Sequence, residues 1–400
     1  MQEKFENPFR PGAGHRPPYL AGRQAERDEF ARLLRQNGIV TENLVLTGLR
    51  GVGKTVLLEE LKPQAIQAGW LWAGSDLSES ASVSELRMAQ RIITDLAVVT
   101  SQISVAVETQ TTNFRSEKSN YNLDVGVLST IFDEVPGLTA DKLKGLIVNV
   151  WGIIAQATNA RGLVLAYDEA QTISDQPKKE EYPLAMLLDV FQSVQRRGVP
   201  MMLVLTGLPF LFPKLVEART FAERMFHVQT LKSLSKEESR QAILKPVEAA
   251  KDCPVTLSEQ SVETVIGLSG GYPYFIQFIC REVYDAFLQS DSPPQVPVSE
   301  IEAKLDASFF QGRWARATDR QRELLCVIAQ LESCDEEFTV QEIVQASRNA
   351  ESKSFSSSHA NQMLAALGNE GLIFKNRHGK YSFAVPLMGR FIRREMKLPG

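Results

Sequence analysis

The sequence predicts an α/β domain built on a parallel sheet, followed by an all-helical segment and a small domain of three helices and a β-hairpin. Up to residue 231, short apolar runs alternate with amphipathic stretches of helical spacing, which is typical of a parallel sheet covered on both faces. From Leu234 to Phe310 only helical spacing remains. We therefore expect three domains, at residues 1–231, 232–314 and 315–400.

The composition excludes several classes of protein. The 400 residues carry a net charge of -4 with 23% charged residues, so any surface for nucleic acid must be local. The four cysteines stand singly, which indicates neither a zinc site nor a disulfide framework. The chain starts without the apolar run of a signal peptide, and its most apolar segment, residues 145–155, is too short to cross a bilayer. We expect a cytoplasmic protein with no membrane partner.

The strongest motif is Gly48–Thr55, which fits the pattern G-x-x-x-x-G-K-[ST] of the phosphate-binding P-loop. The apolar run Asn43–Thr47 precedes it as a strand, and helical spacing begins at Val56. Glycines let backbone N–H groups surround phosphates, and the helix N-terminus adds positive partial charge. The residues expected to hold ATP and Mg²⁺ here are Gly48, Gly51, Val52, Gly53, Lys54, Thr55 and Val56. Lys54 reaches the β- and γ-phosphates, and the Thr55 hydroxyl is a Mg²⁺ ligand.

A second motif, which is acidic, follows the P-loop about a hundred residues later in the chain. The run Arg161–Tyr167 is an apolar strand that ends in Asp168 and Glu169, which is the Walker B pattern. We expect Asp168 to hold Mg²⁺ and Glu169 to polarise the attacking water.

Three further residues are candidates for the same chemistry. Thr206 ends the apolar strand that starts at Val199, where it would face the γ-phosphate, or would be an ordinary strand end. The stretch Leu211–Phe226 is expected to be one helix that carries Arg219 and Arg224 near its end. The remaining helices and strands expected in this domain are Glu26–Leu34, Gly69–Gly74, Val83–Val98, Leu143–Ala157, Leu184–Arg197 and His227–Thr230.

One segment interrupts the alternation of strands and helices. Apolar residues alternate with others at Ile103–Val107 and again at Tyr121–Val127, which predicts an inserted β-hairpin at about residues 101–130. Its polar tip contains Arg115 and Lys118. These two charges either contact DNA or a partner, or lie on a solvated loop.

The C-terminal part is expected to be helical first and then mixed. Four helices are predicted at Glu237–Lys251, Ser258–Leu268, Tyr274–Gln289 and Val298–Phe310, with a glycine hinge before the third. Helices at Thr318–Leu331, Thr339–Ala346 and Ser356–Leu367, with strands at Gly371–Asn376 and Lys380–Val385, have the order of a winged helix. The candidate DNA contacts are Ser356, Ser357, Ser358, His359, Asn361, Gln362, Lys375, Arg377, His378 and Lys380, and the basic residues continue as Arg390, Arg393, Arg394 and Lys397. The same fold also serves as a protein-binding module.

Taken together, these motifs resemble the AAA+ ATPases of the origin-recognition initiator type, and especially their uncharacterised bacterial ATP-binding relatives, which are archaeal-ATPase-like. Segments similar to that group occur along nearly the whole chain: Asn7–Gly14, Pro17–Arg23, Asp168–Gln171, Gly207–Pro209, Phe221–Phe226, Gly270–Phe275 and Leu305–Phe310. The resemblance implies a P-loop NTPase core with an AAA+ type parallel sheet, an all-α lid and a C-terminal winged helix.

The resemblance also implies roles for individual residues. Leu20, Gly22 and Arg23 would flank the adenine. Thr206 resembles the first sensor, and Arg224, with Arg219 as the alternative, resembles an arginine finger that acts on a neighbouring subunit. The second sensor, often an arginine in initiators, is replaced here by Tyr272-Pro273, with Pro273 beside the nucleotide. This departure favours a slow switch over a fast motor.

Two functions remain open from the sequence. The first is an ATP-hydrolysing switch that forms a homo-oligomer on duplex DNA, with its turnover stimulated by assembly. The second is a signalling or defence nucleotide switch whose winged helix binds a protein partner. A P-loop kinase would leave the lid and the winged helix without a role.

Overall fold

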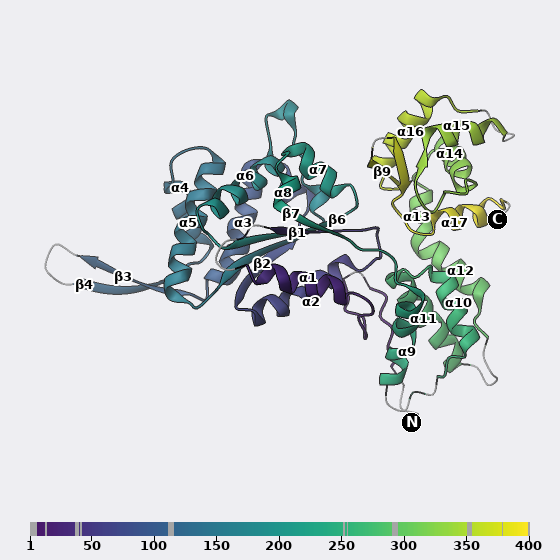
Figure 1. Cartoon of the computed structure of the whole chain (residues 1–400), viewed down its shortest axis with the longest axis horizontal. Coiled ribbons are helices and arrows are strands. Elements are labelled where there is room, and N and C mark those ends of the chain that lie inside the picture. The colour runs from purple at the N-terminus through teal and green to yellow at the C-terminus, as the bar shows by residue number, and fades with distance from the viewer. Residues whose placement is uncertain are drawn as a thin grey trace. The chain divides into compact units, whose positions relative to one another are not determined.

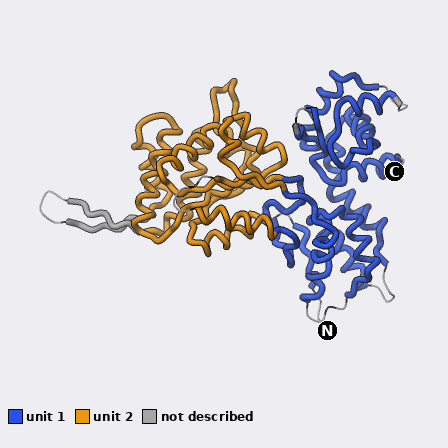
Figure 2. Tube along the Cα trace, in the orientation of Figure 1, with its two compact units in different colours: residues 1–23, 48–56, 231–400 blue, residues 24–47, 57–230 orange. Residues whose placement is uncertain are grey.

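The chain forms two compact units (Figure 2). One unit contains residues 24–47 and 57–230, and the other contains residues 1–23, 48–56 and 231–400. The computed structural model describes residues 6–12, 14–36, 40, 42–110, 116–250, 253, 255–289, 295–349, 354–377 and 379–398, with only the backbone described at 104–110, 116–121, 349 and 377. We call the two units the sheet unit and the helical unit.

A five-stranded sheet is the centre of the sheet unit. Its strands are β1 (Asn43–Thr47), β2 (Trp70–Asp76), β5 (Gly162–Asp168), β6 (Met201–Gly207) and β7 (Phe226–Thr230). Their order is β2-β5-β6-β1-β7, and every neighbouring pair is parallel. The parallel sheet predicted from the sequence is therefore confirmed. Strands β1, β5 and β6 are buried along their whole length, which explains their continuous apolar runs.

Helices cover both faces of this sheet (Figure 1). The helices of this part of the chain are α1 (Gln24–Leu34), α2 (Lys54–Gln67), α3 (Glu85–Thr100), α4 (Val125–Glu134), α5 (Thr139–Ala157), α6 (Pro183–Arg196), α7 (Leu211–Ala218) and α8 (Ala222–Met225). Helices α1 and α2 lie on one side, and α3, α5, α6 and α7 on the other. The Phe30 ring of α1 packs edge-on against Trp72 of β2, at 6.3 Å between centroids.

The inserted hairpin is shorter than the sequence predicts. Strands β3 (Ser104–Gln110) and β4 (Ser116–Asn122) pair antiparallel, but the expected extension through Val127 toward residue 130 is wrong, because α4 begins at Val125. The Asp124 side chain caps this helix by accepting a hydrogen bond from the Val127 N–H at 2.9 Å. Leu128 and Phe132 are then buried at helical spacing. Arg115 and the Lys118 side chain lie outside the described residues.

The single helix expected at Leu211–Phe226 is also wrong. Helix α7 ends at Ala218, the backbone is extended at Arg219, and the short helix α8 starts at Ala222. At this extended residue, the Arg219 guanidinium forms two hydrogen bonds with the carboxylate of Asp189 on α6.

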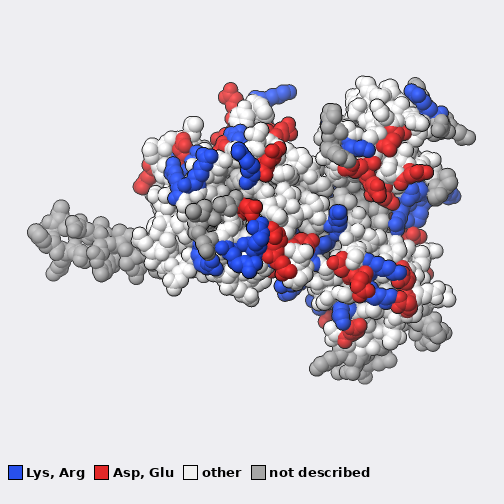
Figure 3. Space-filling view, viewed as in Figure 1, with Lys and Arg blue, Asp and Glu red and all other residues white. Residues whose placement is uncertain are grey.

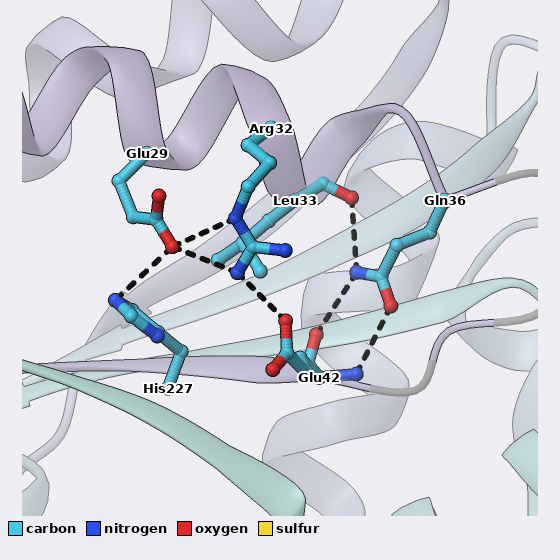
Figure 4. A network of polar contacts seen from close by, with 6 residues as sticks. All are labelled: Glu29, Arg32, Leu33, Gln36, Glu42 and His227. Atoms are coloured by element: carbon cyan, nitrogen blue, oxygen red, sulfur yellow. Dashed lines mark hydrogen bonds and ion pairs between the residues drawn. The ribbon is translucent and has the colours of Figure 1, made fainter.

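A network of polar contacts joins α1 to the edge strand β7 of the sheet (Figure 4). Arg32 bridges Glu29 and Glu42, with Nη2 at 2.7 Å from a carboxylate oxygen of each. Glu29 also lies 3.2 Å from the His227 imidazole of β7. The hydrogen bond from Arg32 lowers the pKa of Glu29, burial opposes this, and the charges of His227 and Arg32 lower it further.

Asn43 forms a second polar connection, inside the sheet. Its side chain is fully buried at the start of β1, accepts from the Leu203 N–H at 2.7 Å and donates to the Met225 carbonyl at 3.1 Å. The Gln195 amide also donates to the Asn43 side-chain oxygen, at 2.8 Å. One amide therefore connects β1, β6, α6 and the end of α8.

The helical unit has two parts in sequence. The first part contains α9 (Lys236–Ala249), α10 (Glu259–Ser269), α11 (Pro273–Leu288), α12 (Val298–Leu305) and α13 (Gln311–Trp314), with the π-helical turn Asp306–Phe310 between the last two. The second part contains α14 (Asp319–Ala329), α15 (Val340–Asn349), α16 (Ser357–Asn369) and α17 (Met388–Glu395), with strands β8 (Phe338–Thr339), β9 (Ile373–Arg377) and β10 (Lys380–Phe383). The helical region after the sheet is confirmed, and its last helix α17 was not predicted. Among the described helices, none has the length and apolarity needed to cross a bilayer.

We expect Asn43→Ala to lower the free energy of unfolding by about 1–3 kcal/mol, because the buried Leu203 N–H and Met225 carbonyl lose their partner. Urea unfolding at constant m-value measures this loss. Asn369→Ala, at the exposed end of α16, is the control, and an equal effect of both changes would contradict the role of Asn43.

We expect Glu29 to stabilise the fold in a pH-dependent way. Because its pKa is lowered on folding from 4.5, its contribution is present above that pH and is lost as the pH falls through the folded value. Since the pair is partly exposed, the difference between the parent and Glu29→Gln in free energy of unfolding should be only about 0.5–1 kcal/mol at pH 7. It should shrink toward zero in acid, and a difference that grows in acid would refute this assignment.

Candidate functional site

The carboxyl ends of the parallel strands bring acidic side chains together at one edge of the sheet. Asp76, the last residue of β2, lies in register with Asp168, the last residue of β5. Thr206 of β6 lies in register with Leu46 of β1, directly before the P-loop in sequence. Ligands of open α/β sheets bind at this edge, where the strands end.

Asp168 is held rigidly at this edge. Its side chain is buried, with 2% exposure, and accepts a hydrogen bond from the fully buried Thr206 hydroxyl. The backbone N–H of Glu169 donates to the same carboxylate at 2.7 Å. Thr206 therefore orients the Asp168 carboxylate, a contact that the sequence did not predict for it.

Glu169 is positioned by its backbone and by Gln171. Its φ angle of 52° is in the left-handed region, which is uncommon for a non-glycine residue. Gln171 donates a hydrogen bond to the Glu169 carboxylate and accepts one from the Leu208 N–H at 3.1 Å. Gln171 thus connects Glu169 to the end of β6. The sequence signals for Gln171 were its place two residues after Glu169 and its inclusion in the family-like segment Asp168–Gln171, and neither predicted a role for it.

Two other charged groups near this edge were missed. Burial raises the pKa of Asp76, and the charges of Asp168 and Glu169 raise it further. Lys214 of α7 donates to the Gln171 carbonyl and to the Ser174 hydroxyl, both at 2.6 Å. Burial lowers the pKa of Lys214. Neither residue belongs to a recognisable motif, because distant segments of the chain bring them to this edge.

The P-loop has the backbone that a phosphate cradle requires. Gly51 and Gly53 have φ angles of 79° and 90°, which favour glycine, and a Cβ built on Gly53 would meet no atom within 4 Å. Lys54 is the first residue of α2, and its ammonium donates to the carbonyls of Gly48 and Leu49 at 3.0 and 3.1 Å. Val52 is buried, whereas Thr55 and Val56 are partly exposed. The open glycine, the ammonium and the helix N-terminus fit a phosphate group.

The N-terminal segment and the hinge pack around this loop within the helical unit. Arg23 donates to the carbonyls of Val52 and Lys232 at 3.0 and 2.8 Å, so it clamps the P-loop. Leu20 is partly exposed, and Gly22 has a positive φ of 51°.

The hinge contacts the P-loop through its backbone. Pro273 is the first residue of α11, which suits its missing N–H. The next residue, Tyr274, donates its backbone N–H to the Gly51 carbonyl at 3.1 Å. The glycine hinge and the P-loop are therefore connected directly.

The two candidate arginine fingers differ in their surroundings. Arg219 forms a two-bond pair with Asp189 at 2.8 and 2.6 Å, and this bonding raises its pKa. Arg224 is exposed on α8, and its side chain makes no hydrogen bond or ion pair with any residue that the structure describes. Of the two side chains, that of Arg224 is the one without a partner among the described residues.

The predicted DNA contacts are only partly available. Residues exposed on α16 are Ser357, Ser358, His359, Asn361 and Gln362, while Ser356 caps the helix by accepting from the His359 N–H. Lys375 is exposed and Lys380 is partly exposed. The Arg377 side chain and His378 lie outside the described residues.

Three of the C-terminal arginines are engaged by other groups of the helical unit. Arg390 donates to the Gly267 carbonyl at 2.8 Å, Arg393 to the Ala329 carbonyl at 2.7 Å, and Arg394 forms two bonds with Asp306. These arginines hold α17 in place. Figure 3 shows basic and acidic side chains interspersed on its visible face.

Comparisons with known proteins bear on this geometry. Residues 19–204 match the family model described as an AAA ATPase domain. Residues 307–392 match a model described as a domain of unknown function, DUF8462. A comparison with curated protein sequences finds no match.

The fold of this chain is similar to that of solved archaeal proteins. The ADPNP-ADP complexes of the Aeropyrum pernix ORC2 protein match with a TM-score of 0.55 and 15% identity, over 97% of this chain and 98% of that one. The ADP form of the same protein matches with a TM-score of 0.53 and 14% identity, over 97% and 96%. At this identity the likeness establishes the fold.

We expect Glu169→Gln to retain ATP binding and to lose hydrolysis by about 10²–10⁴-fold, because the amide cannot take a proton from water. Lys54→Ala should lose ATP binding itself, and Glu134→Gln, an exposed change on α4, should alter neither. Turnover assays and fluorescent ATP titrations separate the two effects. Hydrolysis by Glu169→Gln at the parent rate would refute the role of Glu169.

Proposed function

We propose that this protein is an ATP-binding and ATP-hydrolysing AAA+ switch that forms a homo-oligomer and engages duplex DNA through its C-terminal domain. The observation that carries the ATP part is the P-loop backbone, with left-handed Gly51 and Gly53 before the Lys54 ammonium. The nucleotide complexes of the similar Aeropyrum pernix ORC2 protein support the same ligand.

The roles of the site residues are proposed as follows. Lys54 holds phosphates, Thr55 and Asp168 hold Mg²⁺, and Glu169 orients the attacking water. Hydroxyl and carboxylate oxygens are the hard ligands that Mg²⁺ prefers. When bound, Mg²⁺ offsets the negative charge of the β- and γ-phosphates. Thr206 keeps the Asp168 carboxylate in one orientation by its hydrogen bond. Leu20, Gly22, Arg23 and Pro273 are proposed to border the nucleotide.

Oligomer formation is proposed from Arg224. This exposed guanidinium has no partner among the described residues, whereas the alternative, Arg219, is engaged by Asp189. An arginine finger supplied by a neighbouring subunit contributes about 10³–10⁵ in rate. An isolated subunit should therefore hydrolyse ATP slowly.

Duplex DNA is proposed as the partner of the last 86 residues, which we take as a winged helix over residues 315–400. Helices α14, α15 and α16 precede the β9–β10 hairpin, as in that fold. Helix α16 buries Ala360, Met363, Leu364 and Leu367 and exposes small polar side chains that suit groove contacts. The partial loss of the basic surface predicts modest affinity, with few phosphate contacts.

Turnover measured across a protein concentration series, with and without duplex DNA, tests this function. We expect the specific rate to rise with concentration and to rise again with duplex. Arg224→Ala should abolish the concentration dependence, and Arg219→Ala should lower stability by losing its pair with Asp189. A parent rate that stays flat in both series would contradict the assembly and DNA parts.

The salt dependence of duplex affinity distinguishes the remaining alternative. We expect affinity to fall as salt increases, because phosphate contacts release counterions. Absence of duplex binding even at low salt would refute the DNA proposal. It would then leave the signalling or defence switch with a protein partner as the function to pursue.

A further inference from the structure

Three arginines of the helical unit are close enough for their charges to interact, and one of them belongs to the P-loop. Arg50 is the third residue of the loop, and Arg313 and Arg316 come from α13 and the turn that follows it. Burial lowers the pKa of the Arg313 guanidinium, and the positive charges of Arg50 and Arg316 lower it further. A partly desolvated cation with like-charged neighbours is unfavourable unless an anion joins it.

Packing fixes the place of Arg313 relative to the loop. The Tyr274 N–H binds the Gly51 carbonyl at 3.1 Å, and the Tyr274 ring lies against Phe309 with 5.2 Å between centroids. The Arg313 guanidinium lies over the same Phe309 ring, 4.5 Å from its centroid, and donates to the Phe309 carbonyl. A continuous set of contacts thus joins the glycine loop to Arg313.

In the part of the chain that the structure describes, these arginines lack the counter-ions that other arginines have. Arg219, Arg240 and Arg394 each pair with a carboxylate. Within the described ranges, Arg50, Arg313 and Arg316 form no ion pair, and no carboxylate contributes to the pKa of Arg313. Arg50 and Arg313 are each partly buried. The cluster therefore has a net positive charge that an external anion could neutralise.

We propose that Arg50 and Arg313, assisted by Arg316, bind the terminal phosphate of the nucleotide in the P-loop. This inference rests on the proposed ATP binding and adds residues to that site. Arg50 lies between Gly48 and Gly51, in the loop whose backbone surrounds the β- and γ-phosphates. Guanidinium groups bind phosphate oxygens through paired, charge-assisted hydrogen bonds.

A phosphate contact at Arg313 would also affect the C-terminal domain, because of where Arg313 lies in the chain. Helix α13 directly precedes the C-terminal domain, and Arg50 lies near Gly371 of that domain, where a Cβ would be 3.9 Å from Arg50 Nη2. A γ-phosphate that engages both guanidiniums changes the charge balance where the P-loop meets this domain. Arg313 thereby distinguishes ATP from ADP, although it lies outside the hinge. The hinge itself carries Tyr272-Pro273 in place of an arginine.

Titration of the full-length protein with fluorescent ATP and ADP analogues in Mg²⁺ tests the proposal. We expect Arg313→Gln to weaken ATP binding about 10-fold or more, as for a lost charge-assisted hydrogen bond, and ADP binding less than about twofold. Arg50→Gln should show the same selective loss. Arg348→Gln, an exposed change on α15, is the matched control and should alter neither affinity.

Each other outcome is decisive. Unchanged ATP affinity in both variants would overturn the inference and leave the proposed ATP binding intact. An equal loss of ATP and ADP affinity, with a lowered urea midpoint, would show that Arg313 only supports the fold. Absence of nucleotide binding by the parent protein would instead refute the proposed function itself.

Discussion

The left-handed backbone at Gly51 and Gly53 is the constraint on which the nucleotide site depends. A side chain at either position would be strained, since both φ angles lie well inside the region that favours glycine. This turn sets the start of α2 at Lys54 and leaves the Gly51 carbonyl free to accept from Tyr274 of α11. The same few residues thus shape the phosphate cradle and connect it to the hinge.

At the acidic edge of the sheet, hydrogen bonds from neighbouring groups hold the two carboxylates of the Walker B pattern. Thr206 and the Glu169 N–H hold Asp168, while Gln171 connects Glu169 to the start of the loop after β6. Carboxylates that lie close to one another repel at a cost, and partial desolvation, followed by the charges of Asp168 and Glu169, raises the pKa of Asp76. This cost favours a cation at the edge, in agreement with the proposed Mg²⁺.

The C-terminal arginines show that the number of basic residues in a segment does not predict how many of them are available to bind DNA. Four basic residues within 390–397 suggested a surface for DNA, yet three of them bind carbonyls or the carboxylates of Asp306 and Glu302. A guanidinium whose donors are engaged offers little to a phosphate. By contrast, Arg50 and Arg313 belong to separate segments that no sequence motif connects, although their charges interact in the folded chain.

Local patterns of residues in the sequence determined which elements and motifs could be predicted. The glycine spacing, the apolar strands and the acidic pair at Asp168 predicted the parallel sheet and its loop, because backbone conformation and burial depend on neighbouring residues. The wrong predictions concern the ends of helices, where a single residue decides the boundary: Asp124 caps the start of α4, and the chain leaves the helix at Arg219 after α7. Only the tertiary structure decided which distant groups meet: Gln171 with Leu208, Asp189 with Arg219, and Tyr274 with Gly51. Such pairings depend on the packing of the whole chain, which no short stretch of sequence encodes.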